Sequence, residues 1–190
     1  YAYDANGNVL VFTDANGATA TSLYDELGRK KSTTYAASPS TPSTAWREVV
    51  SESFEYDENG NPLKVHRFVA AGTDPPQDRA IVRTFDALDR LKTETTSLPD
   101  GGTRTVGYEY HPNGTRKAMT DPAGRRTAYE YDAQNRLKRM VTNTDPGATT
   151  SSEGALGETT YAYYADDLMK EVVSPNGVRA TSTYDKAGRL

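Results

Sequence analysis

The chain has 190 residues, a hydrophobic content of 35% and a mean hydropathy of −0.76, which together argue against a thick buried core. Its net charge of −4, its pI near 5.3 and the lack of any Lys or Arg block argue against nucleic acid or an acidic membrane surface as a partner. No cysteine is present, which excludes disulfides and thiolate metal sites, and no apolar stretch is long enough for membrane insertion as a helix.

One short phrase recurs along the whole chain. It begins with Tyr or Phe, usually continues with Asp, and often carries Gly and Arg three and four positions after the Asp. The eight copies are YDANGNVL from Tyr3, YDELGRKK from Tyr24, YDENGNPL from Tyr56, FDALDRLK from Phe85, YHPNGTRK from Tyr110, YDAQNRLK from Tyr131, YYADDLMK from Tyr163 and YDKAGRL from Tyr184. The shortest step between copies is 21 residues and occurs three times, so 21 residues is the minimal repeat.

A second turn sequence lies about midway between successive copies. In the minimal repeats it is TDANGAT from Thr13, TDPAGRR from Thr120 or SPNGVRA from Ser174. The longer repeats carry insertions at the same place, at 36–46, 70–78, 98–103 and 143–158. Because loops tolerate extra length where they face solvent, we expect one end of the repeats to be open to variation and the other to be held tight.

Each repeat is predicted to be a strand, a short turn, a strand and a longer turn. Asn-Gly and Asp-Gly are turn formers, and the runs between turns, such as VLVFT and RTAYEY, are rich in β-branched and aromatic residues. Residues 78–91 (DRAIVRTFDALDRL) have a helical look, but they overlay the repeat, so we expect strands there too. The predicted fold class is all-β: a repetitive antiparallel β-hairpin array of about fifteen strands.

Strict alternation along these strands leaves neither side uniformly apolar. Tyr129 and Tyr131 share one side, whereas Leu63 and Val65 alternate with Lys64. A sandwich needs one apolar face, so we expect one wide sheet with tyrosine and leucine ladders across neighbouring repeats. Residues 1–190 would then form a single array of about seven complete repeats and one partial repeat, and both ends fall within a repeat, as expected of a fragment of a longer array.

The iterated phrase and its period resemble the YD (Rhs) repeats of bacterial Rhs and wall-associated proteins, of the C components of Tc toxins, and of animal teneurins. The resemblance covers essentially the whole chain. It implies a curved, shell-like sheet, which in the toxin members encloses an effector and in teneurins belongs to an adhesion receptor. The residues that match the repeat motif, and to which the resemblance assigns a structural role, are Tyr3, Asp4, Tyr24, Asp25, Gly28, Arg29, Tyr56, Asp57, Phe85, Asp86, Tyr110, Tyr131, Asp132, Tyr163, Tyr184, Asp185, Gly188 and Arg189.

Several copies depart from the motif. His111 and Tyr164 take the Asp position, and Asp89 and Asn135 take the Gly position. Asn8 and Asn61 take the Arg position. Such drift is typical of a structural repeat, in which each copy needs only to form a turn. The self-cleaving domain of the family is not visible, and DPAG at Asp121–Gly124 is in register with the second turn, so we interpret it as a turn.

The sequence supports metal, catalytic, glycosylation and ligand sites less well than it supports structural turns. The Asp-x-Asn-Gly turns lack the spacing of a calcium loop, so we expect their Asp side chains to bond their own backbone. The repeated Asp and Arg could pair between repeats. His66 and His111 have no nucleophile near them in sequence, and the sequon at Asn113 is interpreted as a turn. Trp46, in the first insertion, is expected to anchor that loop or to contact a ligand such as a sugar.

These observations predict a structural protein and not an enzyme, with no catalytic residue, no metal and no cofactor. Its function would be to enclose or display another polypeptide, such as a toxin or effector, in a large secreted or cell-surface bacterial protein, a location that rests on the resemblance alone. The predicted partners are neighbouring repeats of the same polypeptide or other copies, with an enclosed effector or a surface glycan as further candidates. The alternatives are a carbohydrate- or partner-binding adhesion module, and a self-assembling filament if the chain is complete.

Overall fold

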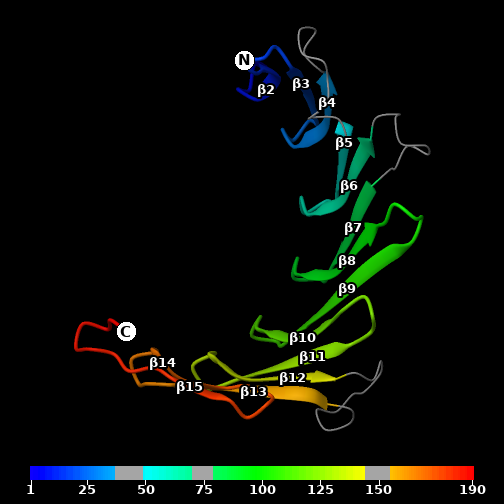
Figure 1. The fold of residues 1–190 in the computed structure, drawn as a ribbon. Helices are drawn as coiled ribbons and strands as arrows, with labels where there is room; N and C mark the ends of the chain where they lie inside the picture. Colours follow the sequence, from blue (N-terminus) through cyan, green and yellow to red (C-terminus); the bar gives the residue numbers. More distant parts are fainter. Residues whose placement is uncertain (37–48, 70–78, 144–154) are drawn as a thin grey trace. The chain divides into compact units, whose positions relative to one another are not determined.

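The computed structural model describes residues 1–36, 49–69, 79–143 and 155–190 (Figure 1). The described residues form strands joined by turns and contain no helix, so none crosses a membrane as a helix. The strands are β1 (Ala2–Tyr3), β2 (Val9–Thr13), β3 (Thr19–Tyr24), β4 (Lys30–Ala36), β5 (Val49–Tyr56), β6 (Pro62–Val69), β7 (Arg79–Phe85), β8 (Leu91–Ser97), β9 (Thr103–Tyr110), β10 (Arg116–Thr120), β11 (Arg126–Tyr131), β12 (Leu137–Asn143), β13 (Ala155–Tyr163), β14 (Met169–Val173) and β15 (Arg179–Thr181).

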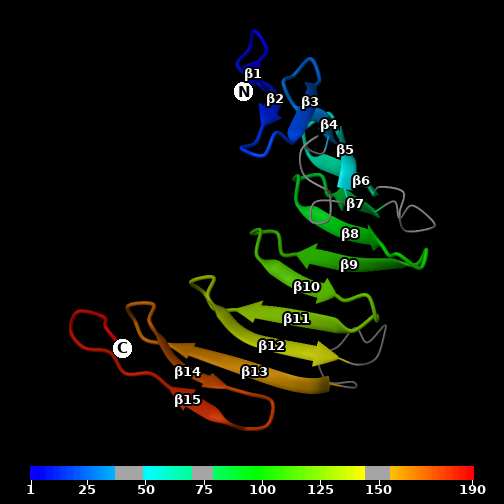
Figure 2. The same cartoon turned by 45° about the horizontal axis from the view of Figure 1, so that its top comes forward.

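The strands are hydrogen-bonded in chain order, from β1 to β15, as one open sheet (Figure 2). The predicted all-β array of antiparallel hairpins is therefore confirmed, including the two strands β7 and β8 in the stretch that looks helical in sequence. The chain divides into two compact units, Tyr1–Thr105 and Val106–Leu190, and each is described by itself. The curvature expected from the resemblance stays a prediction.

A β-bulge recurs at the same place in the hairpins that the recurring phrase closes. Between β3 and β4, Tyr24 pairs with Lys30 but Leu23 pairs with Ser32, which leaves Lys31 without an opposite residue. The same shift occurs in seven hairpins. The unopposed residues are Leu10, Lys31, Leu63, Lys92, Lys117, Lys138 and Lys170. Each bulge moves the residues after it to the opposite side of the sheet.

The bulges overturn the strict alternation expected from the sequence. In the second unit, cross-strand pairs place Tyr129 with Met140 and Tyr161 with Val172 on one side of the sheet. Arg139, which alternation alone would put on the same side as Leu137, instead pairs with Glu130 on the other side. In this unit the sheet therefore has a tyrosine face and a charged face.

Ion pairs join strands on the charged face of the second unit, both adjacent strands and strands one apart. Arg139 contacts Glu130 of β11 and Glu158 of β13, with nitrogen–oxygen distances of 2.8 Å to each. Arg126 contacts Glu109 at 3.1 Å, across the intervening β10. The carboxylates of these pairs are about half exposed, so each pair contributes about 1 kcal/mol or less and the pairs chiefly fix the register of the strands.

The buried core is thin, as the composition predicts. Among the described residues, the buried hydrophobic side chains are Ala118 and Val141, and no large side chain is fully buried. A single sheet has no second layer to pack against, so its stability depends on the backbone ladder and on contacts between neighbouring strands.

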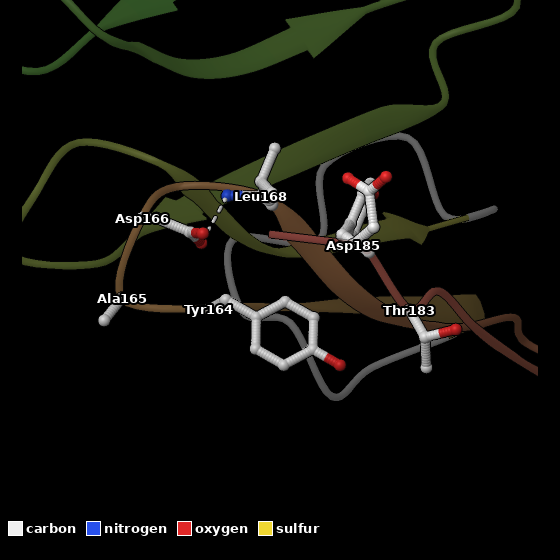
Figure 3. A pocket seen from close by; sticks show the side chains of 7 residues that line it. Tyr164, Ala165, Asp166, Leu168, Thr183 and Asp185 are labelled. Carbon is white, nitrogen blue, oxygen red and sulfur yellow. Dashed lines mark hydrogen bonds between the residues drawn. The ribbon is translucent and has the colours of Figure 1, made fainter. Parts of the chain in front are cut away.

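An open pocket of about 550 Å³ is lined by two turns, the one that follows β13 and the one that follows β15 (Figure 3). Tyr164, Asp166 and Leu168 line it from the first of these turns. Tyr184 and Asp185 line it from the next turn. The pocket is therefore bordered by turns of two successive repeats.

Candidate functional site

The recurring phrase forms one kind of turn in all eight copies, called here the Tyr-Asp turn. In the copy from Tyr24, the N–H of Gly28 donates to the Asp25 carbonyl at 3.0 Å, and the N–H of Asp25 donates to the Arg29 carbonyl at 2.9 Å. Gly28 has a φ of 74°, a left-handed conformation that glycine adopts without strain. This is a three-residue hairpin loop, a type I turn followed by a left-handed residue.

The aspartate side chain holds the turn from inside. Asp25 Oδ1 accepts the N–H of Leu27 at 3.0 Å and that of Arg29 at 2.8 Å, while its Oδ2 accepts Arg29 Nε at 2.7 Å. The prediction that these aspartates bond their own backbone is confirmed. The Asp–Arg pairs that the sequence suggested between repeats instead lie mainly within single turns, at Asp25–Arg29, Asp86–Arg90, Asp121–Arg125, Asp132–Arg136 and Asp185–Arg189.

These hydrogen bonds favour the ionised carboxylates. The Asn8 side chain, followed by its backbone N–H, lowers the pKa of Asp4. Desolvation acts to raise the pKa of Asp25, but hydrogen bonds from the side chain and backbone of Arg29 outweigh it and leave this pKa lowered. Because every hydrogen bond is made to the charged form, protonation of these aspartates would loosen the turn.

Neighbouring Tyr-Asp turns are tied to each other through a tyrosine and an arginine, a contact called here the joint. The Tyr56 hydroxyl donates to the Lys30 carbonyl of the preceding repeat at 2.9 Å. In return, Arg29 of that preceding repeat lies over the Tyr56 ring, 4.7 Å from its centre. Arg29 Nη1 also donates to the Asp57 carbonyl at 3.0 Å. The motif Tyr thus reaches back one repeat, and the motif Arg reaches forward one repeat.

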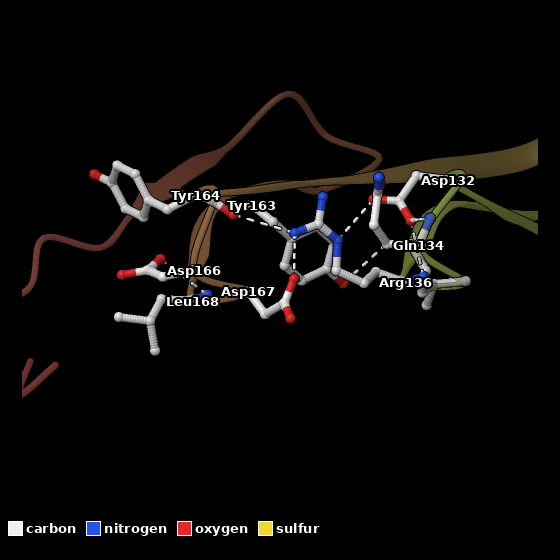
Figure 4. Close-up of polar contacts among 9 residues, drawn as sticks. Asp132, Gln134, Arg136, Tyr163, Tyr164, Asp166, Asp167 and Leu168 are labelled. Carbon is white, nitrogen blue, oxygen red and sulfur yellow. Dashed lines mark hydrogen bonds and ion pairs between the residues drawn. The ribbon is translucent and has the colours of Figure 1, made fainter.

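The second unit contains a joint of the same geometry (Figure 4). The Tyr163 hydroxyl donates to the Leu137 carbonyl at 2.9 Å. Arg136 lies 4.7 Å from the centre of the Tyr163 ring, and its Nη1 donates to the Tyr164 carbonyl at 3.1 Å. Two joints in separate units therefore share the same donors, acceptors and stacking.

The joint also affects its tyrosine hydroxyl. Desolvation raises the pKa of Tyr56, and the Asp25 carboxylate adds to this while Arg29 opposes it. The pKa of Tyr163 is raised for the same first reason, with Asp132 adding to it. A hydroxyl that donates to a carbonyl has to keep its proton, and this environment favours the protonated form.

The departures at the Gly position have a structural use. Asp89, Asn135 and Asp167 occupy it with φ between 58° and 68°, which costs more for these residues than for glycine. Each accepts a hydrogen bond from the preceding repeat. The donors are Asn59 and Asn61 to Asp89, Asn113 to Asn135, and Arg136 to Asp167. What looks like drift in the sequence is a second contact between repeats.

The Asn residues that stand at the Arg position preserve the turn, but their side chains are shorter than that of Arg and, among the described residues, do not reach the backbone carbonyl of the next repeat. Asn8 Nδ2 donates to Asp4 Oδ2 at 2.8 Å, and Asn61 Nδ2 donates to Asp57 Oδ2 at 2.9 Å. These amides replace the Arg–Asp pair within the turn. Asn61 still reaches the next repeat, but through Asp89 and not through a backbone carbonyl.

The second turns close with the same backbone bonds. In TDPAGRR, the Asp121 N–H donates to the Arg125 carbonyl and the Gly124 N–H donates to the Asp121 carbonyl, both at 2.9 Å. The interpretation of DPAG as a turn is confirmed. The insertions at 36–46, 70–78 and 143–158 fall largely outside the described residues, as does Trp46, so its expected ligand contact stays a prediction.

The two histidines belong to different units. His66 is in β6 and its ring contacts Phe68 at 4.7 Å between centres, while His111 is in a Tyr-Asp turn with its ring 6.2 Å from that of Tyr131. Within the described ranges, no group of three or more His, Asp or Glu could hold a metal ion. The matched motif residues form joints and turns, and two of them, Tyr184 and Asp185, also line the pocket.

The fold and the joints define the class: an all-β array of hairpins in which side chains tie neighbouring repeats together at the joints. The family profile described as RHS Repeat matches residues 3–40 and 110–150. The resemblance predicted from the sequence is thereby confirmed over these two regions. No curated protein matches the chain.

Solved structures similar to the chain include Tc toxin assemblies. A crystal structure of TcdB2-TccC3 is 16% identical, with a TM-score of 0.42 and 96% of this chain covered. A Photorhabdus luminescens Tc holotoxin pore is 16% identical, with a TM-score of 0.41 and 97% covered. The chain spans 12% of the length of each of these chains. A porin-like protein from Bacteroides uniformis is 14% identical, with a TM-score of 0.36 and 91% of both chains covered.

Proposed function

We propose that this chain is a wall segment of an Rhs-repeat shell, which encloses or displays another polypeptide in a large secreted or surface protein of a bacterium. The wall acts by shape and has no catalytic role. The observation that carries the proposal is the joint, in which Tyr56 reaches back to Lys30 and Arg29 reaches forward to Asp57. The two repeats that meet at a joint are thereby fastened through side chains as well as through the strand ladder.

A wall needs continuity more than it needs a precise active site. The joints occupy only the Tyr-Asp end of the hairpins, while the insertions enter at the other end. Length can therefore vary at one edge of the sheet without disturbing the contacts that join repeats. This division supports a structural role, as do the RHS repeats in two regions of the chain.

Protease protection tests the proposal in the natural polypeptide that carries the array. The region outside the repeats should resist digestion when the array is present and should be degraded when the array is deleted. An array supplied as a separate chain is the matched control, because it restores solubility without enclosing the region in the same polypeptide. Equal digestion with and without the array would contradict a wall function.

The adhesion alternative has its own test. A glycan array probed with the 190-residue chain should show no retention if the chain is only a wall. Specific retention of a sugar that is lost in Trp46→Ala would favour the adhesion module instead.

A further inference from the structure

The pocket in the second unit lies where a joint has lost its arginine. In the turn from Tyr163, Leu168 takes the position that Arg29 and Arg136 occupy in the two joints. Tyr164 takes the Asp position of the same turn, so the usual Arg–Asp pair is replaced by two uncharged side chains. Figure 3 shows Leu168 and Tyr164 on one side of the pocket, with Asp185 and Thr183 of the next repeat facing them.

The groups that hold an arginine in the other joints are still present here. Tyr184 supplies the ring that corresponds to Tyr56, and its edge-to-face contact with Tyr164 has a centre distance of 6.1 Å. The Asp185 carbonyl corresponds to that of Asp57, and both accept the N–H of their turn glycine, at 3.0 and 3.1 Å. In the Asp57 turn, the same oxygen also accepts Arg29 Nη1, because a carbonyl oxygen has two lone pairs.

The surroundings of the pocket favour a cation. Asp166 lines it, and its contact with the Leu168 N–H is long, at 3.5 Å. Lys170 Nζ lies 5.7 Å from the centre of the Tyr164 ring, so a cation already contacts one of the two rings. Within the residues that the structure describes, no Lys or Arg is stacked on the Tyr184 ring itself.

We infer that this pocket binds the guanidinium group of an arginine side chain from a partner polypeptide, in the place of the arginine that the repeat lacks. The guanidinium would stack on Tyr184, donate to the Asp185 carbonyl and face the Asp166 carboxylate. A planar cation with several N–H donors fits this combination of ring and oxygens better than an ammonium does. The volume of about 550 Å³ admits a side chain together with its backbone.

The probe is N-acetyl-arginine amide, titrated into the isotopically labelled 190-residue chain while backbone amide signals are followed by NMR. Saturable shifts are expected at Leu168, Tyr184 and Gly188, with a dissociation constant of about 1–10 mM. N-acetyl-citrulline amide has the same shape without the charge and should bind at least about 10-fold more weakly. N-acetyl-lysine amide should fall between the two.

The variant Leu168→Arg supplies the missing arginine from within the chain and should abolish these shifts. Leu88→Arg is the matched control, because Leu88 is an exposed turn leucine that does not line the pocket and its substitution adds the same charge. Equal binding of arginine and citrulline amides, or undiminished binding to Leu168→Arg, would overturn the inference. If Leu168→Arg does not fold, Tyr184→Leu takes its place. This variant should lose binding because it removes the ring on which the guanidinium stacks.

This inference goes beyond the wall function, and the two proposals are tested independently. Failure of the arginine titration would leave the protease protection result unaffected. Equal digestion with and without the array would leave the arginine site intact.

Discussion

At the residue scale, the motif tyrosine is a hydrogen-bond donor as well as a ring. Tyr56 and Tyr163 each place a hydroxyl on a backbone carbonyl of the preceding repeat. Each also presents its ring to an arginine of that repeat. Phe85 keeps the ring at its position in the motif but has no hydroxyl to donate.

Removal of the hydroxyl alone isolates its contribution. Tyr56→Phe and Tyr163→Phe should each lower the free energy of unfolding by about 0.5–1.5 kcal/mol, because one part-buried hydrogen bond is lost and a carbonyl is left without its donor. Urea denaturation measures the change. Tyr129→Phe is the control, since the Tyr129 hydroxyl donates no hydrogen bond within the described part of the chain, and a change as large there would contradict the role of the joint.

The left-handed aspartate at position 89 is a second residue-scale test. Asp89→Ala keeps the strained φ of 58° and removes the acceptor for Asn59 and Asn61, so it should cost about 1–2 kcal/mol. Asp89→Gly loses the same bonds but relieves the strain, so its unfolding free energy should stay within about 0.5 kcal/mol of the wild type. The measurement is chemical denaturation of both variants, and equal losses in the two would show that strain plays no part.

At the element scale, the hairpin is the unit that the sequence predicts well. Asn-Gly turns, β-branched runs and the 21-residue period are local signals, and they place the strands and the tight turns. The bulge was not predicted, because an unopposed residue such as Lys138 is visible only once the partner strand is in register. The joint was missed for a related reason: it connects residues that lie 26 and 28 positions apart, such as Tyr56 with Lys30 and Arg29 with Asp57.

The two ends of a hairpin should differ in their tolerance of added length. Two residues, Gly-Ser, inserted after Pro122 in a second turn should be accepted at a cost of about 1 kcal/mol or less. The same pair inserted after Gln134 displaces Arg136 from the joint and should lower the urea midpoint at least about twice as much. Paired urea titrations decide the matter, and equal sensitivity at the two ends would contradict the division between tight and variable turns.

At the scale of the whole molecule, stability is distributed over many similar contacts and not held in a core. Ala118 and Val141 are the buried hydrophobic side chains among the described residues. Repeat arrays of this kind gain stability from each interface between neighbours, so the loss of one joint should weaken the array locally. The summed effect of the aspartates and tyrosines should appear in the dependence of stability on pH.

The aspartates of the turns determine the pH below which the chain loses stability. Their folded-state pKa values are lowered, so their contribution is present above the unfolded value of about 4 and is lost as the pH falls through the folded values. The unfolding free energy should therefore be level from about pH 7 to pH 5 and fall below about pH 4. The carboxylates with a lowered pKa include Asp4, Asp25, Asp57, Asp86, Asp121, Asp132 and Asp185.

The tyrosines determine the pH above which the chain loses stability, because their pKa values are shifted in the opposite direction from those of the aspartates. The folded-state pKa values of Tyr56 and Tyr163 are raised, so their contribution is complete below the unfolded value of about 10 and is lost as the pH rises through the folded values. Urea midpoints measured across the pH range should form a plateau that falls at both ends. The double variant Tyr56→Phe/Tyr163→Phe should shift the alkaline fall and leave the acid fall unchanged, and an unchanged alkaline fall would contradict the tyrosine assignment.

The central claim is that Arg29 and Tyr56 couple two neighbouring repeats, and a double-mutant cycle tests it most directly. The variants are Arg29→Ala, Tyr56→Leu and their combination, compared by urea denaturation, with Arg29→Ala combined with Tyr163→Leu as the control pair that shares no joint. The expected result is a favourable coupling of about 0.5–1 kcal/mol for Arg29 with Tyr56 and none for the control pair. Additive losses for Arg29 and Tyr56 would contradict the claim, because the two side chains would then stabilise their own repeats without joining them.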